Sequence, residues 1–438
     1  MPPGLAECGR LCQHPPAPGT PSPPGEANGR PSPSPYRHPQ PDTMETPSEQ
    51  ARQLFIQGID HFESGRLVAA RDAFATALAL VPGRPSLLAN LAAVHFRLQE
   101  FAEARSCFEQ LLASEAGNPD NWISLGLCEE ALGHWQAAAE ALERGLASRP
   151  DAALWLRCSN CRGRLGQLPA ALAAVDKALQ LAPTDGLAWS ARGSLLREMQ
   201  QFAAAAECFE KALAHGADTE LNRYYLASVR GDGKPQAPPR QYVEALFDDY
   251  AADFQSHLVE GLRYRGHETL VQPLLAAATT YGSALDLGCG TGLCGALIRP
   301  LCTAIDGVDL SAAMLDQART RGIYRQLAHD ELAAFLNKCT GRYELILAAD
   351  VFGYIGDLSG IFRSVRRLLQ PGGRFAFTVE QATAGNDFNL LPNLRYTHTE
   401  AYIRRLAADS GFTLRTLSAA PLRYDQTQPV MALYVHLD

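Results

Sequence analysis

The 438-residue chain lacks the features of membrane and secreted proteins. It has no uninterrupted apolar run of about 18 residues, the length that a membrane-spanning helix requires. Its amino terminus also has no basic segment followed by an apolar stretch and a small-residue cleavage site, which is the pattern of a secretory signal peptide. These absences predict a cytoplasmic protein that does not contact a membrane.

An excess of positive charge is also absent. The chain has 47 acidic and 39 basic residues, which gives a formal net charge of -8. Stable binding to DNA or RNA depends on basic side chains that neutralise phosphates. We therefore expect no nucleic acid among the partners of this protein.

A disulfide framework is missing as well. The 11 cysteines are odd in number and scattered through apolar patterns, which indicates reduced thiols. Cys158 and Cys161 form a C-x-x-C pair inside a helical stretch, but no second pair and no histidine lies nearby. Because a metal site needs such additional ligands, we expect no metal and interpret both thiols as packing residues.

Proline is concentrated at the amino terminus, where 13 of the 29 prolines fall within the first 43 residues. Glycine, serine and alanine surround them, and large aliphatic side chains that could form a core are nearly absent. This composition predicts that residues 1–50 are a disordered, proline-rich leader. Ordinary composition resumes at Met44, which is a second candidate for the first residue.

Residues 51–218 repeat with a period of about 34 residues. The recurring residues are Gly58, Ala70, Phe74, Ala77 and Pro82, which return as Gly193, Ala205, Phe209 and Ala212, while Trp122, Trp155 and Trp189 share one phase. They resemble the tetratricopeptide repeat, whose helix pairs approach closely through small residues. The resemblance implies about five repeats, which begin near residues 51, 85, 119, 152 and 186.

An array of such repeats forms a superhelical groove that binds peptides or other proteins. We therefore expect a protein or peptide partner in the groove, with self-association or support of the next domain as the alternative. Residues 219–240 are expected to contain a capping helix and then a linker, because the last repeat has an apolar face to cover and residues 231–240 are rich in glycine and proline.

Residues 241–438 change from continuous helices to alternating strands and helices. Short apolar runs lie at residues 284–287, 304–308, 345–348, 375–379 and 431–435, and helical stretches separate most of them. This alternation predicts a doubly wound α/β domain with a mainly parallel sheet and an antiparallel final hairpin strand.

A glycine-rich loop follows the first of these strands. Gly288, Gly290 and Gly292 alternate with other residues, and such a loop lets a ligand approach bare backbone at the start of a helix. Dinucleotide-binding loops have the spacing G-x-G-x-x-G, but Leu293 stands at the last of those positions. Asp286 would repel a pyrophosphate, whereas it would attract a ligand that carries an ammonium and a sulfonium group.

These residues resemble the first motif of class I S-adenosylmethionine-dependent methyltransferases. The resemblance implies a Rossmann-like domain with a seven-stranded, mainly parallel sheet, and S-adenosylmethionine as the cofactor. Cofactor-binding residues would be Asp286, Gly288, Gly290, Gly292, Asp309, Leu310, Met314, Asp330 and Asp350. Asp309 ends the next strand, where a carboxylate can accept both ribose hydroxyls. Leu310 and Met314 would sandwich the adenine, and Asp330 would lie beside its amino group.

Two further segments, residues 343–352 and 368–374, resemble the fourth-strand motif of this family and the turn into its fifth strand. The phrase at residues 247–254 and the preceding repeats look like a set of predicted methyltransferases with tetratricopeptide repeats. The resemblance covers nearly all of residues 241–438.

Methyl transfer is an in-line displacement from a good leaving group, so a protein chiefly has to hold the acceptor collinear with the methyl group. A base is needed only for an acceptor that arrives protonated. The candidate catalytic residues are Asp350, Tyr354 and His398, which follow the fourth strand or lie in the insertion after the fifth. Asp350 could instead cap a helix or contact the cofactor, and His398 could be an ordinary histidine at the surface or at a helix terminus.

No N-P-P-Y or D-P-P-Y phrase follows the fourth strand, which disfavours methylation of base or amide nitrogens. We therefore expect transfer to an oxygen, nitrogen or carboxylate on a small molecule or on a protein. In the second case the repeats would recruit the substrate. The alternative function is a scaffold of repeats whose methyltransferase-like domain binds the cofactor without reacting.

Overall fold

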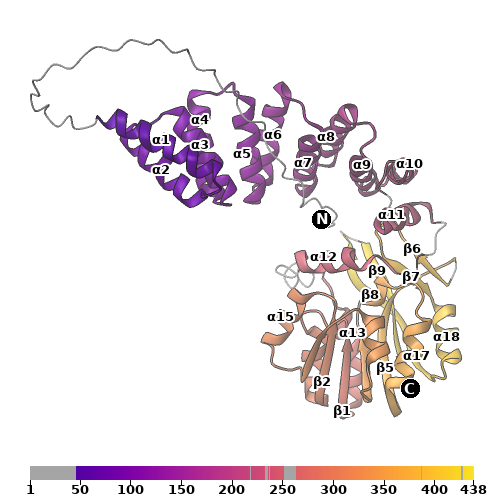
Figure 1. Ribbon diagram of the computed structural model, residues 1–438. Helices are drawn as coiled ribbons and strands as arrows, with labels where there is room; N and C mark the ends of the chain where they lie inside the picture. Colours follow the sequence, from indigo (N-terminus) through magenta and orange to yellow (C-terminus); the bar gives the residue numbers. More distant parts are fainter. Residues whose placement is uncertain are drawn as a thin grey trace, which may run out of the picture. The chain divides into compact units, whose positions relative to one another are not determined.

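The computed structural model describes residues 46–217, 219–231, 235, 237–250, 263–385, 387–425 and 428–438 (Figure 1). The predicted leader therefore lies outside the described residues up to position 45. Contacts divide the chain into two compact units, with the boundary between Leu181 and Ala182. The predicted repeats thus contribute residues to both units.

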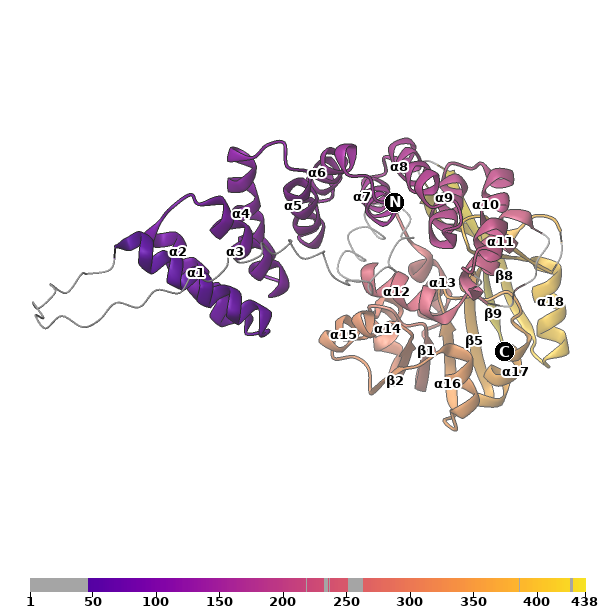
Figure 2. The ribbon, with the colours of Figure 1, turned by 45° about the horizontal axis from the view of Figure 1, so that its top comes forward.

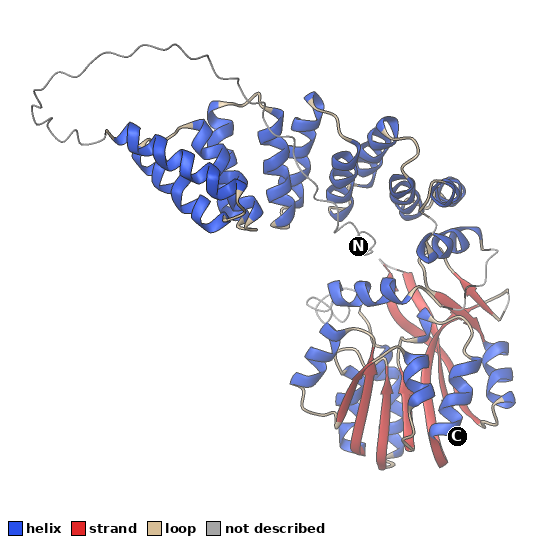
Figure 3. Ribbon diagram, in the orientation of Figure 1, coloured by secondary structure: helices blue, strands red, loops and turns tan. Residues whose placement is uncertain are grey.

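The described residues of the first unit form four helix pairs (Figure 3). They are α1 (Pro47–Glu63) with α2 (Leu67–Leu80), α3 (Pro85–Arg97) with α4 (Phe101–Ser114), α5 (Pro119–Ala131) with α6 (Trp135–Ser148), and α7 (Ala152–Arg164) with α8 (Leu168–Leu181). Three of these pairs start at a predicted repeat boundary, and α1 starts four residues earlier than predicted. The 34-residue period therefore identified the helix pairs correctly.

Small residues allow the two helices of a pair to approach closely. A Cβ atom added at Gly58 would lie 2.5 Å from Cε1 of Phe74, and one at Gly126 would lie 2.8 Å from Cγ of Leu142. In these two pairs a glycine of the first helix faces a large apolar residue of the second helix, whereas Ala92 and Ser159 stand at the corresponding positions of α3 and α7. The repeated glycine and the repeated large residue are thus two sides of one contact.

Replacing Gly58 with alanine should lower the free energy of unfolding by about 1 to 3 kcal/mol, the usual cost of overpacking. Urea unfolding followed by circular dichroism measures the change. Gly360 is the matched control, because it is also helical and its added Cβ atom would have no neighbour within 4 Å. Equal stability of the Gly58→Ala and Gly360→Ala variants would contradict the packing role of Gly58.

The first helix begins inside the predicted leader. The Thr46 hydroxyl accepts a hydrogen bond from the backbone of Glu49, whose carboxylate in turn accepts one from the Thr46 backbone over 2.8 Å. Pro47 fills the first helical position, where no backbone donor is needed. The prediction of disorder up to residue 50 is therefore wrong for residues 46–50.

The second unit begins with three more helices. Helices α9 (Gly186–Glu198) and α10 (Phe202–Ala214) form the fifth predicted pair, and α11 (Glu220–Arg230) is the predicted capping helix. The Thr219 side chain caps the start of α11, and Gly231 ends it with a left-handed φ of 67°. Helix α12 (Arg240–Tyr250) follows and leads into the α/β domain.

The α/β domain contains a nine-stranded sheet (Figure 3). Its strands are β1 (Tyr281–Leu287), β2 (Cys302–Asp309), β3 (Gln326–His329), β4 (Tyr343–Ala348), β5 (Leu369–Ala382), β6 (Phe388–Leu390), β7 (Tyr396–Thr399), β8 (Leu414–Asp425) and β9 (Gln428–Leu437). The order β3-β2-β1-β4-β5 is parallel throughout, and β9 joins β5 in the antiparallel direction and also pairs with β8.

The seven expected strands are present, but the predicted number of strands is too low, because the sheet contains nine. The inserted strands β6 and β7 form an antiparallel pair, and β7 also runs parallel to the last residues of β5. Glu380 of β5 consequently pairs with Thr397 on one side and with Ala432 of β9 on the other. Strand β4 pairs with β5 as far as Phe377, so β7 continues along the same side of β5 where β4 ends.

Helices cover both faces of this sheet (Figure 2). One face is buried under α16 (Leu332–Lys338), α17 (Ser359–Leu368) and α18 (Glu400–Asp409), and the other under α13 (Gly266–Ala277) and α14 (Leu293–Ile298). The central strands are therefore apolar on both sides, which explains their continuous apolar sequences. Across the described part of the chain, no helix combines the length and apolar character that spanning a bilayer takes.

Candidate active site

The glycine loop connects β1 to α14, and all three glycines adopt positive φ angles. A Cβ atom at Gly288 would lie 2.3 Å from Cγ2 of Val351, and one at Gly292 would lie 3.0 Å from Cδ of Arg321. At Gly290 the same atom would have no neighbour within 4 Å. The outer glycines therefore fit the loop against the protein, and the middle one leaves its backbone open to a ligand.

Asp309 lies at the end of β2, directly beside this open backbone. Its Oδ2 atom accepts a hydrogen bond from the Gly290 amide over 2.7 Å, and Oδ1 accepts one from the Ser311 amide over 2.9 Å. Burial raises the pKa of Asp309, although these two backbone donors oppose the shift. The structure thus brings together the glycine loop and the carboxylate, 19 residues apart in the sequence, that were predicted to hold the cofactor.

The other predicted cofactor residues near Asp309 differ in accessibility. The Asp330 amide donates to the Asp309 carbonyl over 3.2 Å, and its carboxylate accepts from Lys338, which lowers the pKa of Asp330. Leu310 is half-buried, whereas Met314 is 1% exposed and packs inside the domain. The contacts of Leu310, Met314 and Asp330 with adenine remain predictions.

Asp286 lies beneath the glycine loop. Its carboxylate accepts a hydrogen bond from the Tyr324 hydroxyl over 2.7 Å, and burial raises its pKa from the ordinary 3.8 to about 7. Two glycines make room for the tyrosine, because added Cβ atoms would lie 2.4 Å from the Tyr324 hydroxyl at Gly295 and 3.1 Å from its ring at Gly307. The carboxylate therefore faces Tyr324, and its predicted attraction to the cofactor remains a prediction.

Asp286 should make the stability of the ligand-free protein pH-dependent. Because its pKa is higher in the folded state, protonation favours folding, and this contribution is lost as the pH rises from about 4 to about 7. The Asp286→Asn variant should be more stable than the wild type at pH 8, by on the order of 2 to 4 kcal/mol. Urea unfolding between pH 4 and pH 8 tests this expectation.

The matched control for that experiment is Asp316→Asn, at an exposed helical position. It should keep the pH dependence of the wild type. If Asp286→Asn follows the same pH profile as the wild type, Asp286 does not carry a raised pKa.

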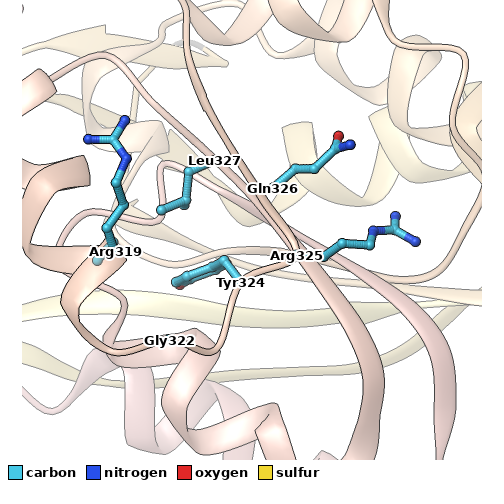
Figure 4. Close-up of a pocket in the computed structure, with 7 residues that line it drawn as sticks. Arg319, Gly322, Tyr324, Arg325, Gln326 and Leu327 are labelled. Carbon is cyan, nitrogen blue, oxygen red and sulfur yellow. The ribbon is translucent and has the colours of Figure 1, made fainter.

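A separate pocket of about 200 Å³ lies beside β3 (Figure 4). It is lined by Ala318, Arg319, Gly322, Tyr324, Arg325, Gln326 and Leu327. Figure 4 shows Arg319 and Arg325 extending away from each other, and they pair with Asp316 and Asp306 respectively. The pocket includes none of the loop glycines, and its cations are already paired, so we do not place the cofactor there.

Helix α12 lies next to α15 (Ala312–Thr320), near the carboxyl end of β2 (Figures 1 and 2). The Asp248 carboxylate accepts a hydrogen bond from the Ser311 hydroxyl over 2.5 Å. Asp248 belongs to the phrase at residues 247–254, of which residues 251–254 lie outside the described part. In the described part of this segment, Asp248 therefore contacts the residues that follow Asp309.

A cluster of four charged residues lies at the carboxyl ends of β4 and β5. Arg395 pairs with both Asp350 and Glu380. Arg423 of β8 adds a 2.7 Å hydrogen bond to Glu380 and lies 3.6 Å from Asp350. Asp350 has a left-handed φ of 57°, which is unusual for a residue other than glycine. We name these four residues the charge cluster.

The charge cluster is largely buried, so the charges depend on one another. Burial alone would raise the pKa of Glu380, but Arg395 and Arg423 outweigh it and hold that pKa below its ordinary value. The Arg395 guanidinium also lies 4.5 Å from the ring centre of Tyr354. Two of the three predicted catalytic residues, Asp350 and Tyr354, therefore meet around Arg395, and their catalytic roles remain predictions.

The third predicted catalytic residue, His398, is not at the surface. It lies on β7 with no exposed area, and its Nε2 atom is 2.9 Å from the Gly356 carbonyl. Burial lowers the pKa of His398 to about 4. The expectation of a surface histidine is wrong, because Phe388 and Tyr402 pack against this side chain. The alternative of a helix-terminal position is correct, since His398 directly precedes Thr399, the cap of α18. A neutral histidine with so low a pKa is a weak base.

Sequence reasoning did not identify Tyr324 or Arg423. Tyr324 is 38 residues from its partner Asp286, and Arg423 is 43 residues from Glu380. The sequence holds only an indirect signal for Tyr324, namely the glycines at positions 295 and 307. Tyr324 occupies the space that larger side chains at these two positions would fill. Arg423 lies in a strand that the apolar pattern does not reveal.

Comparison with known families agrees with both parts of the fold. A methyltransferase domain family matches residues 285–375. Tetratricopeptide repeat families match residues 61–116, 90–153, 123–186 and 187–214. The first match begins at the end of β1 and includes the glycine loop and Asp309.

Two curated relatives are O-methyltransferases. The malonyl-[acyl-carrier protein] O-methyltransferase of Enterobacter lignolyticus is 28% identical over 198 residues, which cover 41% of this chain and 74% of that protein. The ubiquinone biosynthesis O-methyltransferase of Xanthomonas oryzae pv. oryzae is 30% identical over 108 residues, which cover 23% of this chain and 44% of that protein. The chain thus spans less than half the length of the second relative.

Solved structures resemble the two parts separately. Magnesium protoporphyrin IX methyltransferase from Synechocystis PCC 6803, crystallised with bound SAH, matches 45% of this chain and 98% of its own with a TM-score of 0.36 and 17% identity. The match to YrrB, a tetratricopeptide repeat protein, covers 40% of this chain and 90% of YrrB, with a TM-score of 0.37 and 20% identity. The family matches thus place tetratricopeptide repeats within residues 61–214 and a methyltransferase domain at residues 285–375, the segment that holds the glycine loop and Asp309.

Proposed function

We propose that this protein transfers a methyl group from S-adenosylmethionine to an acceptor bound at the carboxyl ends of β4 and β5. The observation that carries the proposal is the open backbone of Gly290 beside the Asp309 carboxylate. A nucleoside needs both features, because its ribose hydroxyls require an acceptor and its remainder requires close approach to the loop.

The residues of the loop fit this cofactor. Asp309 would accept hydrogen bonds from the ribose hydroxyls, and the bare backbone at Gly290 would face the amino-acid portion. Asp330 would lie beside the adenine. When bound, S-adenosylmethionine supplies a methyl group on a positively charged sulfur that is a good leaving group.

The acceptor would lie near the charge cluster and Tyr354. Asp350 and Tyr354 follow β4 and Glu380 lies near the end of β5, and the carboxyl ends of these strands are at the same edge of the sheet as the glycine loop. Because His398 has a pKa of about 4, it offers no strong base at neutral pH, and the Asp350 carboxylate is already paired with Arg395. The proposed chemistry therefore relies on holding the acceptor in line with the methyl group.

The acceptor group is proposed to be an oxygen of a small molecule or of a protein. The two relatives described above are named as O-methyltransferases, which favours oxygen over nitrogen. The repeats would bind a protein or peptide in their groove, and this partner would be the acceptor itself or would bring it to the domain.

Label transfer tests this function. Purified full-length protein is incubated with methyl-labelled S-adenosylmethionine and cell extract, and the protein and small-molecule fractions are counted separately. We expect label in one fraction, with the Asp309→Ala variant as the control for background. Binding of the cofactor without label in either fraction would instead support the scaffold function.

A further inference from the structure

Residues 391–396, which are the connection from β6 to β7 and the first residue of β7, contact two parts of the second unit at once. From the fifth repeat, the Arg197 guanidinium of α9 donates a 2.7 Å hydrogen bond to the Pro392 carbonyl. From the capping helix α11, the Tyr224 hydroxyl donates a 2.9 Å hydrogen bond to the Leu394 carbonyl. Figure 1 shows α11 next to β6 and β7.

Aromatic packing reinforces these two hydrogen bonds. The Tyr224 ring lies 6.4 Å from the ring of Tyr396 and 6.4 Å from that of Tyr242 on α12, measured between ring centres. Tyr224 and Tyr396 are both buried, and the Tyr396 hydroxyl donates to the Pro235 carbonyl over 2.7 Å. The connection is therefore anchored on both sides of Arg395 by residues that belong to the repeats or to the segment that follows them.

Arg395 points from this anchored segment to the candidate acceptor site. It pairs with Asp350 and Glu380, and it packs so closely on Gly353 that an added Cβ atom there would lie 2.5 Å from Nη2. Leu394, the residue before it, has a left-handed φ of 68°. Such a backbone persists only where its surroundings hold it, and here a hydrogen bond from Tyr224 ends on the Leu394 carbonyl.

We propose that the fifth repeat and the capping helix position Arg395 in the active site. Arg197 and Tyr224 are positioning residues, since they hold the backbone on both sides of Asn393 and leave the charge cluster to contact the acceptor. This inference rests on the proposed function in one respect, namely that the acceptor binds at the charge cluster. The fifth repeat would then hold part of the active site in place, in addition to any recruitment of a partner by the repeats.

The test uses full-length Arg197→Gln and Tyr224→Phe variants, each of which removes one donor and keeps most of the side chain. Hydrogen–deuterium exchange of a peptide covering residues 391–398 should become faster by about 3- to 10-fold, the equivalent of one buried hydrogen bond. The matched controls are Arg299→Gln, which loses a bond to the Cys302 carbonyl, and Tyr343→Phe, which loses one to Asp306. Both control residues lie at the amino ends of strands and should leave this peptide unchanged.

The functional readout is the initial rate of label transfer to cell extract. In the Arg197→Gln and Tyr224→Phe variants we expect kcat to fall by about 3- to 10-fold per hydrogen bond, while the KM for S-adenosylmethionine and the Kd for S-adenosylhomocysteine stay within about 2-fold. The Arg197→Lys variant keeps a donor and should restore part of the rate. A merely structural role would instead weaken cofactor binding and catalysis together.

Unchanged exchange at residues 391–398 in both variants would overturn the inference, as would faster exchange with an unchanged transfer rate. If the wild type transfers no label at all, the proposed function fails. The exchange comparison then still decides whether Arg197 and Tyr224 hold this segment, because it needs neither cofactor nor acceptor.

Discussion

The Asp309→Ala variant is expected to bind S-adenosylmethionine about 10- to 150-fold more weakly than the wild type, a loss of about 1.5 to 3 kcal/mol. Such a loss is usual for hydrogen bonds to a charged group. The structure adds a second cause, because the Gly290 amide loses the acceptor that fixes its direction. Isothermal titration calorimetry of the full-length protein measures the affinity directly.

Asp316→Ala is the control for that titration, because it removes an exposed carboxylate from the helix that follows β2. Its affinity should equal that of the wild type. Circular dichroism should confirm that Asp309→Ala retains the fold. A folded Asp309→Ala protein with unchanged affinity would mean that the cofactor does not use the end of β2.

The Arg395→Met variant should show the largest loss of stability, about 3 to 5 kcal/mol in the free energy of unfolding at pH 7. Methionine retains much of the side-chain volume but leaves Asp350 and Glu380 with less compensation in a buried site. The loss of stability arises because the variant leaves buried carboxylates without their cation. Removing both partners of a buried ion pair together would cost less stability, because no uncompensated charge would remain. Urea unfolding measures the difference.

The effect of Arg395→Met should depend on pH in a defined direction. In the wild type, the lowered pKa of Glu380 stabilises the fold above the ordinary carboxyl pKa of about 4.3, and this contribution is lost as the pH falls below that value. The gap between the wild type and the variant should therefore shrink in acid. Arg405→Met, which breaks the exposed pair with Asp387, is the control and should cost about 0 to 1 kcal/mol. Equal losses in the two variants would contradict the account of the charge cluster.

The sequence revealed the helices and the central strands because their signals are local. A small residue recurs opposite a large apolar one at a fixed spacing, as at Gly58 with Phe74 and Gly193 with Phe209, and strands buried on both faces are continuously apolar. Strand β3 lies at the sheet edge and carries Gln326 and His329, so its apolar signal is weak. Strand β8 contains arginines and a proline and was missed for the same reason.

The candidate site divides in a similar way. The loop glycines and Asp309 were predictable, because a strand, a turn and the next strand bring them together within about 20 residues. Tyr324 and Arg423 reach the site through the folded sheet, so no spacing in the sequence points to them. The burial of His398 could not be predicted, because Phe388 and Tyr402, which pack against it, come from separate elements of the fold.

The anchoring of residues 391–396 depends on contacts that are still more remote. Arg197 and Pro392 are 195 residues apart, and they come from segments that the sequence assigns to different domains. The predicted boundary at residue 241 separates them, whereas the compact unit that begins at Ala182 contains both. Sequence periodicity defines where a repeat ends, but tertiary contacts determine the unit to which it belongs.

A crystal structure of the protein soaked with S-adenosylhomocysteine tests the central claim most directly. Both ribose hydroxyls should lie within hydrogen-bonding distance of the Asp309 carboxylate, and the amino-acid portion should lie against the backbone of Gly290. The nucleoside bound at another place, such as the pocket beside β3, would contradict the account, and so would a crystal in which it does not bind.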